Sequence, residues 1–194
     1  MTQVVLIRPG ATDYDDQGRV QGILDIPLSE RGKLQVSALV ERLGGLDLAA
    51  LYCGPGEALA RTAEAVARLS SLRPKRLDDL RNLDQGLWQG LQVDEVRRRY
   101  TRVFRQWLDD PLTVCPPQGE SVVDALERIK AALKPLLRRH RDEVIGLVVA
   151  DPLAQLVACF LRREPHYRLA DETATGTTDT IDVDPDDFKN GDGG

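Results

Sequence analysis

Short apolar segments alternate with amphipathic segments along most of this 194-residue chain, and this alternation predicts an α/β fold. The clearest apolar segments are TQVVLI (residues 2–7) and VIGLVVA (residues 144–150). Both are short, continuous and rich in β-branched residues, as expected of strands that are buried on both faces. We therefore expect a three-layer α/β/α sandwich with a mainly parallel central sheet.

The remaining elements follow the same alternation. Helices are predicted at residues 29–45, 57–69, 92–108, from 121 onward and at 151–161, and further strands at 48–53 and 179–183. Ser121 with Asp124 forms a capping-box-like helix start, and Pro152 suits a first helical turn. Pro135 lies late in the helix that begins at Ser121, where we expect it to kink or end that helix.

Length and composition bound the domain organisation. We expect one domain over residues 1–186 and a disordered tail at 187–194, where the sequence becomes KNGDGG. The fractions of 42% hydrophobic and 29% charged residues are those of an ordinary globular protein. A net charge of −5 argues against a nucleic-acid partner. The basic clusters at 97–100 and 136–143 are interpreted as solvated helix faces or helix C-termini.

The cysteines and the hydropathy pattern indicate the cellular compartment of the protein. Cys53, Cys115 and Cys159 are too few and too scattered for a disulfide framework or a zinc site. No secretory leader precedes the first strand, and no apolar run approaches the ~20 residues that span a bilayer. We expect a cytoplasmic protein with no membrane association and no metal or other cofactor.

The carboxyl ends of the predicted strands carry Arg8, Cys53 and Asp151. Ligands collect at such ends in open α/β sheets. After Arg8 come a Pro9-Gly10 turn and a polar loop, within the stretch LIRPGATDYDDQGRVQG (residues 6–22). This stretch is the first candidate for a ligand site.

Several segments together resemble the histidine phosphatase superfamily, which includes cofactor-dependent phosphoglycerate mutases and acid phosphatases. The matching pieces, spread over about residues 3–184, are residues 6–22, DIPLSERGKLQ, LYCGPGEALARTAEA, LRNLDQGLWQG, PPQGES and VIGLVVAD. The resemblance implies a phosphoglycerate mutase-like fold. It also implies chemistry carried by two histidines, two arginines and an acid, the histidine of R-H-G being the phosphorylated nucleophile.

This chain departs from that pattern at almost every position. The resemblance places the first arginine on Arg8, but the nucleophile on Pro9 and the second arginine on Ala58. The proton donor falls on Asn82, the second histidine on Asp151, and the asparagine of the first loop on Asp15. The histidines of this chain, His140 and His166, lie outside the motifs and are interpreted as structural or exposed.

These replacements remove different parts of one mechanism. Proline has no nucleophilic lone pair, and an asparagine amide does not exchange protons near neutral pH. Two carboxylates, Asp15 and Asp151, face one guanidinium where a phosphate dianion needs positive charge. Arg19 and Arg61 are substitute cations, whereas Asp151 and Cys53 are disfavoured as substitute nucleophiles. Because an unpaired buried charge is costly, we expect Arg8 to be neutralised by Asp151 or Asp15.

The resemblance and its departures together favour a non-catalytic relative, a pseudoenzyme that serves as a binding, regulatory or structural module. Its partner is an unknown protein or a non-phosphate small ligand, and a homo-oligomer stays open. The vestigial pocket consists of Arg8, Pro9, Gly10, Asp15, Arg19, Cys53, Ala58, Arg61, Asn82 and Asp151. The alternative is a phosphatase or phosphoglycerate mutase-like enzyme with weak or altered activity on phosphate esters. A third hypothesis is a cationic or metal-containing ligand bound by Asp13, Asp15, Asp16 and Asp151.

Overall fold

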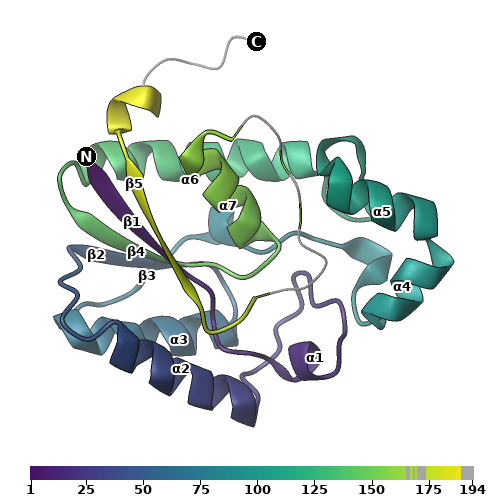
Figure 1. Cartoon of the computed structure of the whole chain (residues 1–194), viewed down its shortest axis with the longest axis horizontal. Helices are drawn as coiled ribbons and strands as arrows, with labels where there is room; N and C mark the ends of the chain where they lie inside the picture. The colour runs from purple at the N-terminus through teal and green to yellow at the C-terminus, as the bar shows by residue number, and fades with distance from the viewer. Residues whose placement is uncertain (165–166, 168, 170–173, 189–194) are drawn as a thin grey trace.

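The core of the molecule is a five-stranded sheet with the strand order β3–β2–β4–β1–β5 (Figure 1). A computed structural model describes residues 1–164, 167, 169 and 174–188. Its parallel strands are β1 (Thr2–Ile7), β2 (Ala50–Cys53), β3 (Lys75–Arg76) and β4 (Val144–Val148). The edge strand β5 (Thr178–Val183) pairs antiparallel with β1. The expected mainly parallel sheet is confirmed.

Helices cover both faces of the sheet, as a strand buried on two sides requires. Val5 and Ile7 of β1 pack on the side of α2 (Glu30–Arg42) and α3 (Glu57–Ala67). The alternating residues Val4 and Leu6 pack on the opposite side, which is covered by the two helices α6 (Val122–Arg139) and α7 (Leu153–Arg162). Figure 1 shows the resulting three layers, which confirms the predicted sandwich.

The helix that follows Ser121 continues through Pro135. The Ser121 hydroxyl accepts the Asp124 backbone N–H at 3.1 Å, as the capping pattern indicates. Pro135 does not end the helix, and α6 continues to Arg139. Proline removes one backbone donor, while Leu133 and Leu137 on either side of it remain buried in the core. This burial outweighs the missing hydrogen bond.

Residues 92–108 form two helices rather than one. These are α4 (Val93–Arg99) and α5 (Thr101–Asp109), with a break at Tyr100. The aromatic ring of Trp88 contacts the rings of Tyr100 and Trp107, with centroids 6.0 and 5.9 Å apart. The chain therefore turns around a buried tryptophan, a long-range contact that a periodicity pattern does not contain.

The packed part of the chain extends past the predicted boundary at residue 186. A 3₁₀ turn spans Pro185–Phe188, and the buried Phe188 ring lies 5.0 Å from the ring of Phe160. The predicted tail at 187–194 therefore begins at least two residues too early. Residues 189–194 lie outside the described residues.

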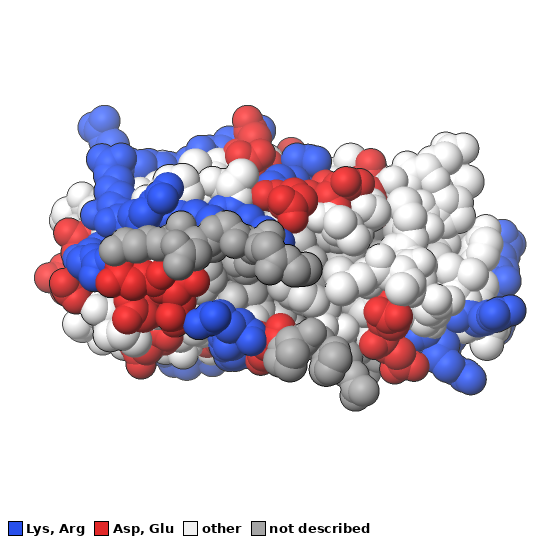
Figure 2. Space-filling model, turned by 90° about the horizontal axis from the view of Figure 1, so that it is seen from above, with Lys and Arg blue, Asp and Glu red and all other residues white. Residues whose placement is uncertain are grey.

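The surface above α6 mixes charges of both signs (Figure 2). Arginines of the two basic clusters have nearby carboxylates: Arg99 pairs with Glu95 at 2.7 Å, and Arg141 pairs with Asp186. Such pairs suit the interpretation of solvated helix faces. Within the described residues, every helix is too short or too polar to cross a membrane.

Candidate active site

A cavity of about 500 Å³ opens beyond the carboxyl ends of β1 and β4. Its lining includes Pro9 and Gly10 after β1, Ala58 in the first turn of α3, and Asp151 after β4. The turn packs tightly, because a Cβ added to Gly10 would lie 2.4 Å from the carbonyl oxygen of Gly32. These family-matched segments, distant in sequence, therefore meet at one place.

Arg8 is buried and is neutralised by two carboxylates. Its Nε donates to Asp151 Oδ1 at 3.0 Å, and its Nη1 donates to Asp179 Oδ2 at 2.9 Å. Burial alone would lower the pKa of the Arg8 guanidinium, but the attraction of Asp151 and the bonds from Asp179 raise it overall. The expected neutralisation by Asp151 is confirmed. The second partner, Asp179, lies on the edge strand β5 and was not predicted as a partner of Arg8.

Asp151 separates Arg8 from the cavity. Its side chain is 2% exposed, and its second oxygen accepts the backbone N–H of Ala174 at 2.9 Å. Arg8 is not among the residues that line the cavity. With both oxygens of Asp151 bonded and Arg8 paired, the matched arginine offers no net positive charge to a phosphate.

The predicted substitute on α3 lies elsewhere. Arg61 is exposed on the helix surface, where its guanidinium lies 3.8 Å from Glu57 and 3.5 Å from Glu64. It is not part of the cavity lining, whereas Ala58 is. One helical turn moves a side chain by 5.4 Å along the axis, so Arg61 does not reach the position that Ala58 leaves without charge.

Asn82 and Cys53 support the site from outside the cavity. The Asn82 amide donates to the carbonyl oxygen of Asp151 at 2.9 Å, and its oxygen accepts the backbone N–H of Leu83 at 2.9 Å. Cys53 is buried at the end of β2, where burial raises the pKa of its thiol. A buried thiol with a raised pKa is a poor nucleophile, and neither side chain is among the residues that line the cavity.

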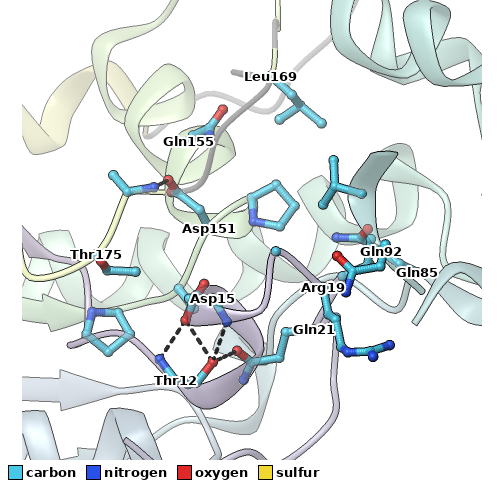
Figure 3. A pocket seen from close by; sticks show the side chains of 18 of the residues that line it. Thr12, Asp15, Arg19, Gln21, Gln85, Gln92, Asp151, Gln155, Leu169 and Thr175 are labelled. Carbon is cyan, nitrogen blue, oxygen red and sulfur yellow. Dashed lines mark hydrogen bonds between the residues drawn. The ribbon is translucent and has the colours of Figure 1, made fainter. Parts of the chain in front are cut away.

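The polar loop after β1 supplies the opposite wall. Its short helix α1 (Asp13–Asp16) begins with a capping box, in which Asp15 Oδ2 accepts from both the backbone N–H and the hydroxyl of Thr12 at 2.7 Å. Arg19 Nη1 donates to the Gly90 carbonyl oxygen at 2.6 Å. Asp15 and Arg19 both line the cavity (Figure 3).

Four glutamines complete the lining and were missed by the motif comparison. They are Gln21, Gln85, Gln92 and Gln155. Gln85 lies within the LRNLDQGLWQG segment that resembles the family. No pattern in the sequence indicates that its amide faces the cavity. Trp107 is buried and also lines the cavity.

The acidic side chains do not form a metal centre. Within the described ranges, no group of three or more His, Cys, Asp or Glu side chains could hold a metal ion. Asp13 and Asp16 are exposed, and Asp16 pairs with Arg31 at 2.5 Å. Asp15 and Asp151 line the cavity. The hypothesis of a ligand bound by all four aspartates therefore has no support from their arrangement.

His140 is structural. It is 7% exposed, and its Nε2 lies 2.8 Å from the Tyr52 hydroxyl while its Nδ1 lies 2.5 Å from Glu143 Oε2. Glu143 directly precedes β4, at the end of that strand opposite the cavity. His166 lies outside the described residues.

The sequence relatives include a phosphatase and a probable mutase. The chain is 32% identical over 148 residues to phosphoserine phosphatase 1 of Hydrogenobacter thermophilus, covering 76% of this chain and 70% of that protein. It is 31% identical over 137 residues to a probable phosphoglycerate mutase GpmB of Salmonella arizonae, covering 71% of this chain but 64% of that protein. It covers only 37% of a bifunctional protein of Mycobacterium tuberculosis, at 35% identity.

Solved structures agree with these sequence relatives. YhfR of Bacillus stearothermophilus superimposes with a TM-score of 0.83 at 26% identity, covering 95% of this chain and 92% of that chain. A mycobacterial glucosyl-3-phosphoglycerate phosphatase superimposes with a TM-score of 0.76 at 27% identity, covering 84% of this chain and 80% of that chain. The predicted phosphoglycerate mutase-like fold is thereby confirmed.

These names contradict the prediction of a non-catalytic protein. Three of these relatives are named as enzymes that act on phosphate esters: a phosphoserine phosphatase, a probable phosphoglycerate mutase and a glucosyl-3-phosphoglycerate phosphatase. Nothing among them indicates a pseudoenzyme, so the prediction that this chain is no enzyme is wrong. The error came from equating the loss of the family's catalytic groups with the loss of all activity. The alternative, an enzyme with weak or altered activity, agrees better with the relatives.

The family assignment rests on nearly the whole chain. The model of the histidine phosphatase superfamily (branch 1) matches residues 4–189, which include all of the strands and helices described above except the first two residues of β1. The matched range contains the β1 turn, the start of α3 and the end of β4, whose side chains line the cavity. The chain belongs to the histidine phosphatase superfamily.

Proposed function

We propose that this protein is an enzyme that acts on phosphate monoesters, as a phosphatase or mutase-like enzyme with weak or altered activity. The observation that carries this proposal is the meeting of Pro9-Gly10, Ala58 and Asp151 around one cavity. Membership of the superfamily and the names of the relatives support it. The altered side chains require a route that differs from the one the family resemblance implies.

Arg19 is the phosphate-binding cation in this proposal. It lines the cavity and, within the described residues, forms no ion pair; its Nη1 and Nε are bonded to neutral oxygens of Gly90 and Gln17. A unit-charge contact at ~4 Å is worth about 4 kcal/mol at an effective dielectric of 20. Arg8, by contrast, has its charge balanced by Asp151 and Asp179.

Water takes the place of the missing nucleophile. Pro9 cannot form a phosphorylated intermediate, so a water oxygen forms the new bond to phosphorus while the bond from phosphorus to the ester oxygen breaks. Asp15, fixed by Thr12, accepts the proton of the attacking water, and the departing alcohol takes a proton from solvent. Without a general acid or a covalent intermediate, we expect slow turnover of esters with poor leaving groups.

Steady-state hydrolysis of p-nitrophenyl phosphate by purified protein tests the proposal. Arg19→Ala should lower kcat/KM at least tenfold, since it removes the phosphate contact. Its control, Arg31→Ala, removes an exposed arginine that is not part of the cavity lining. Asp15→Asn should lower kcat with little change in KM, and Asp16→Asn is its neighbouring control. Turnover no higher than in a mock purification would refute the proposal, as would wild-type activity in Arg19→Ala.

We also propose a cytoplasmic location. Cys53 and Cys115 are free thiols, and Cys115 is exposed. Exposed thiols persist in reducing compartments. Fractionation of the native host, followed by immunodetection, should find the protein in the cytoplasmic fraction.

A further inference from the structure

One side-chain amide in the cavity lining has no hydrogen-bond partner within the described residues. Gln85 is 8% exposed and lines the cavity, yet its side-chain amide forms no hydrogen bond with any residue that the structure describes. Its amide atoms are not among the fully buried side-chain atoms that lack a partner, which in the described chain are Trp88 Nε1 and Thr177 Oγ1. They are therefore open to the space of the cavity, where a ligand can bond to them. Gln92, on the same cavity, likewise has an unbonded amide within the described chain. Figure 3 shows both amides directed into the cavity.

Among the described residues that line the cavity, no cation is left for a second anionic group. Arg97 pairs with Asp94 at 3.0 Å, and Arg8 is balanced behind Asp151. Arg19 is the remaining cation of the lining, and the phosphate requires it. A carboxylate on the alcohol part of a substrate would therefore meet amides and aspartates. Neutral amides cannot offset the desolvation of a carboxylate as a guanidinium does.

An apolar wall lies in the same cavity. The mostly buried rings of Phe104 and Trp107 line it together with the side chains of Leu108 and Leu169. A volume of about 500 Å³ is large for phosphate alone and falls in the range of small-molecule sites. The space suits a ring with an apolar face and a hydrogen-bonding edge.

We propose that Gln85, assisted by Gln92, is a specificity-determining residue that recognises the alcohol part of the substrate. The preferred substrates are phosphate monoesters of uncharged ring compounds with hydroxyl or amide groups, as in sugars and nucleosides. Esters whose alcohol part carries a carboxylate, such as phosphoserine and 3-phosphoglycerate, are disfavoured. This inference rests on the proposed function.

A substrate panel gives the first test. Phosphate release is measured for glucose 6-phosphate, a nucleoside 5′-monophosphate, phosphoserine and 3-phosphoglycerate. We expect at least a tenfold higher kcat/KM for a sugar or nucleoside ester than for either carboxylate ester. The comparison of the sugar ester with the nucleoside ester shows which of these two substrate classes the cavity prefers. Equal or higher kcat/KM for a carboxylate ester would overturn the inference.

Substitution of Gln85 gives the second test. Gln85→Met keeps the length of the side chain but removes its hydrogen-bonding groups. We expect it to raise KM about tenfold for the preferred ring ester and by a smaller factor for p-nitrophenyl phosphate, because a hydrogen-bonding site discriminates through its polar partners. Gln106→Met on the exposed surface of α5 is the control. An equal KM change for both substrates, or none for the ring ester, contradicts the assignment.

A binding measurement separates this inference from the proposed function. Titration calorimetry with glucose and with a nucleoside, neither carrying phosphate, detects the amide site without requiring turnover. One outcome separates the two proposals: no ester is hydrolysed, yet glucose or the nucleoside binds, and Gln85→Met weakens that binding at least fivefold. In that case the proposed function fails and recognition by Gln85 stands. If Gln85→Met does not fold, as seen by circular dichroism, the exposed Gln92→Met supplies the same comparison. Absence of binding by both compounds overturns recognition by Gln85.

Discussion

Two buried arginines hold this molecule together in different ways. Within the described residues, the guanidinium of Arg8, at the end of β1, bonds only to the carboxylates of Asp151 and Asp179. Arg128, on α6, bonds to both oxygens of Glu120 at 2.8 Å and also to main-chain carbonyl oxygens, including that of Asn82 at 3.3 Å. Both arginines are at most 9% exposed. They differ in what their partners would lose on removal of the guanidinium.

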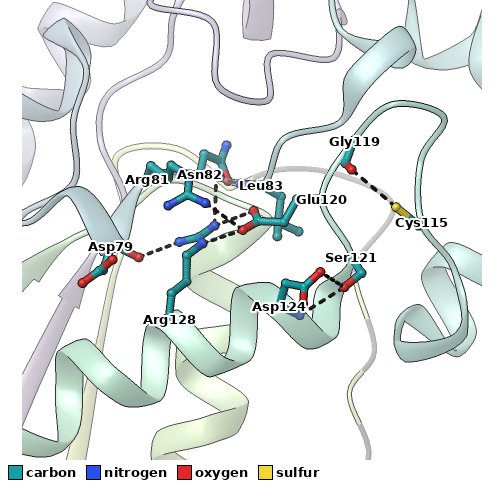
Figure 4. Close-up of polar contacts among 10 residues, drawn as sticks. All are labelled: Asp79, Arg81, Asn82, Leu83, Cys115, Gly119, Glu120, Ser121, Asp124 and Arg128. Atoms are coloured by element: carbon teal, nitrogen blue, oxygen red, sulfur yellow. Dashed lines mark hydrogen bonds and ion pairs between the residues drawn. The ribbon is translucent and has the colours of Figure 1, made fainter.

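The comparison separates charge balance from positioning. Arg8 cancels a carboxylate beside the cavity, whereas Arg128 ties the loop that contains Asn82 to α6 (Figure 4). That loop matters to the site, because the Asn82 amide donates to the carbonyl of Asp151. Arg128 therefore positions the wall of the cavity without being part of its lining.

The largest expected effect follows from removal of Arg8. Arg8→Met leaves the Asp151 carboxylate buried without its cation, and we expect a loss of about 3–5 kcal/mol in the free energy of unfolding. Urea unfolding at pH 7 measures it. Addition of Asp151→Asn should restore at least half of the loss, since the charge that caused it is removed. Additive losses in the double variant would show that Arg8 does not act through the charge of Asp151.

Removal of Arg128 should have a somewhat smaller effect of a different kind. Arg128→Met leaves the carbonyls of Asp79 and Asn82 unbonded, while Glu120 keeps Arg81 at 3.0 Å. We expect a loss of about 2–3 kcal/mol from these orphaned groups. The second substitution Glu120→Gln should not restore stability, because the carbonyls still lack donors. A rescue as large as that at Arg8 would erase the distinction between the two arginines.

The third prediction concerns phosphate rather than stability. Asp151→Asn makes the wall of the cavity more positive by one charge and releases Arg8 from its stronger partner. We expect inorganic phosphate to bind at least tenfold more tightly, about 1.4 kcal/mol, as measured by titration calorimetry. Asp47→Asn makes the same change in net charge on the exposed surface and is the control. Unchanged phosphate affinity would mean that Arg8 stays inaccessible whatever its charge.

The sequence predicted one half of this comparison. Arg8 and Asp151 follow neighbouring parallel strands, so their meeting follows from the topology and from the cost of a buried charge. Asp179 could not be anticipated, because it depends on the register of an antiparallel edge strand that the sequence only suggested. Gln85 could not be anticipated either, since a glutamine acquires a role only from the cavity that it faces. The prediction of a non-catalytic protein was wrong because the absence of the family's catalytic side chains does not show what the remaining side chains of the cavity do.

The exposed ion pair of Asp16 and Arg31 should contribute the smallest stabilisation in this comparison. Asp16 accepts a hydrogen bond from Arg31, and contacts with Ser29 and Arg31 lower the pKa of Asp16 below its ordinary value of 3.8. A lowered pKa means that the stabilisation is present above that ordinary value and is lost as pH falls through the folded-state pKa. Because both side chains are largely solvated, Asp16→Asn should cost less than about 1 kcal/mol at pH 7.

Unfolding curves of wild type and Asp16→Asn between pH 2 and pH 7 check this prediction. The two proteins should differ near neutral pH and converge at the acidic end, and the difference at pH 7 should shrink in high salt, which screens exposed charges. The Arg8 network should show little salt dependence by comparison, because its partner Asp151 is almost fully removed from solvent. Equal salt sensitivity of the Asp16–Arg31 pair and the Arg8–Asp151 pair would show that burial does not set the strength of the Arg8–Asp151 pair.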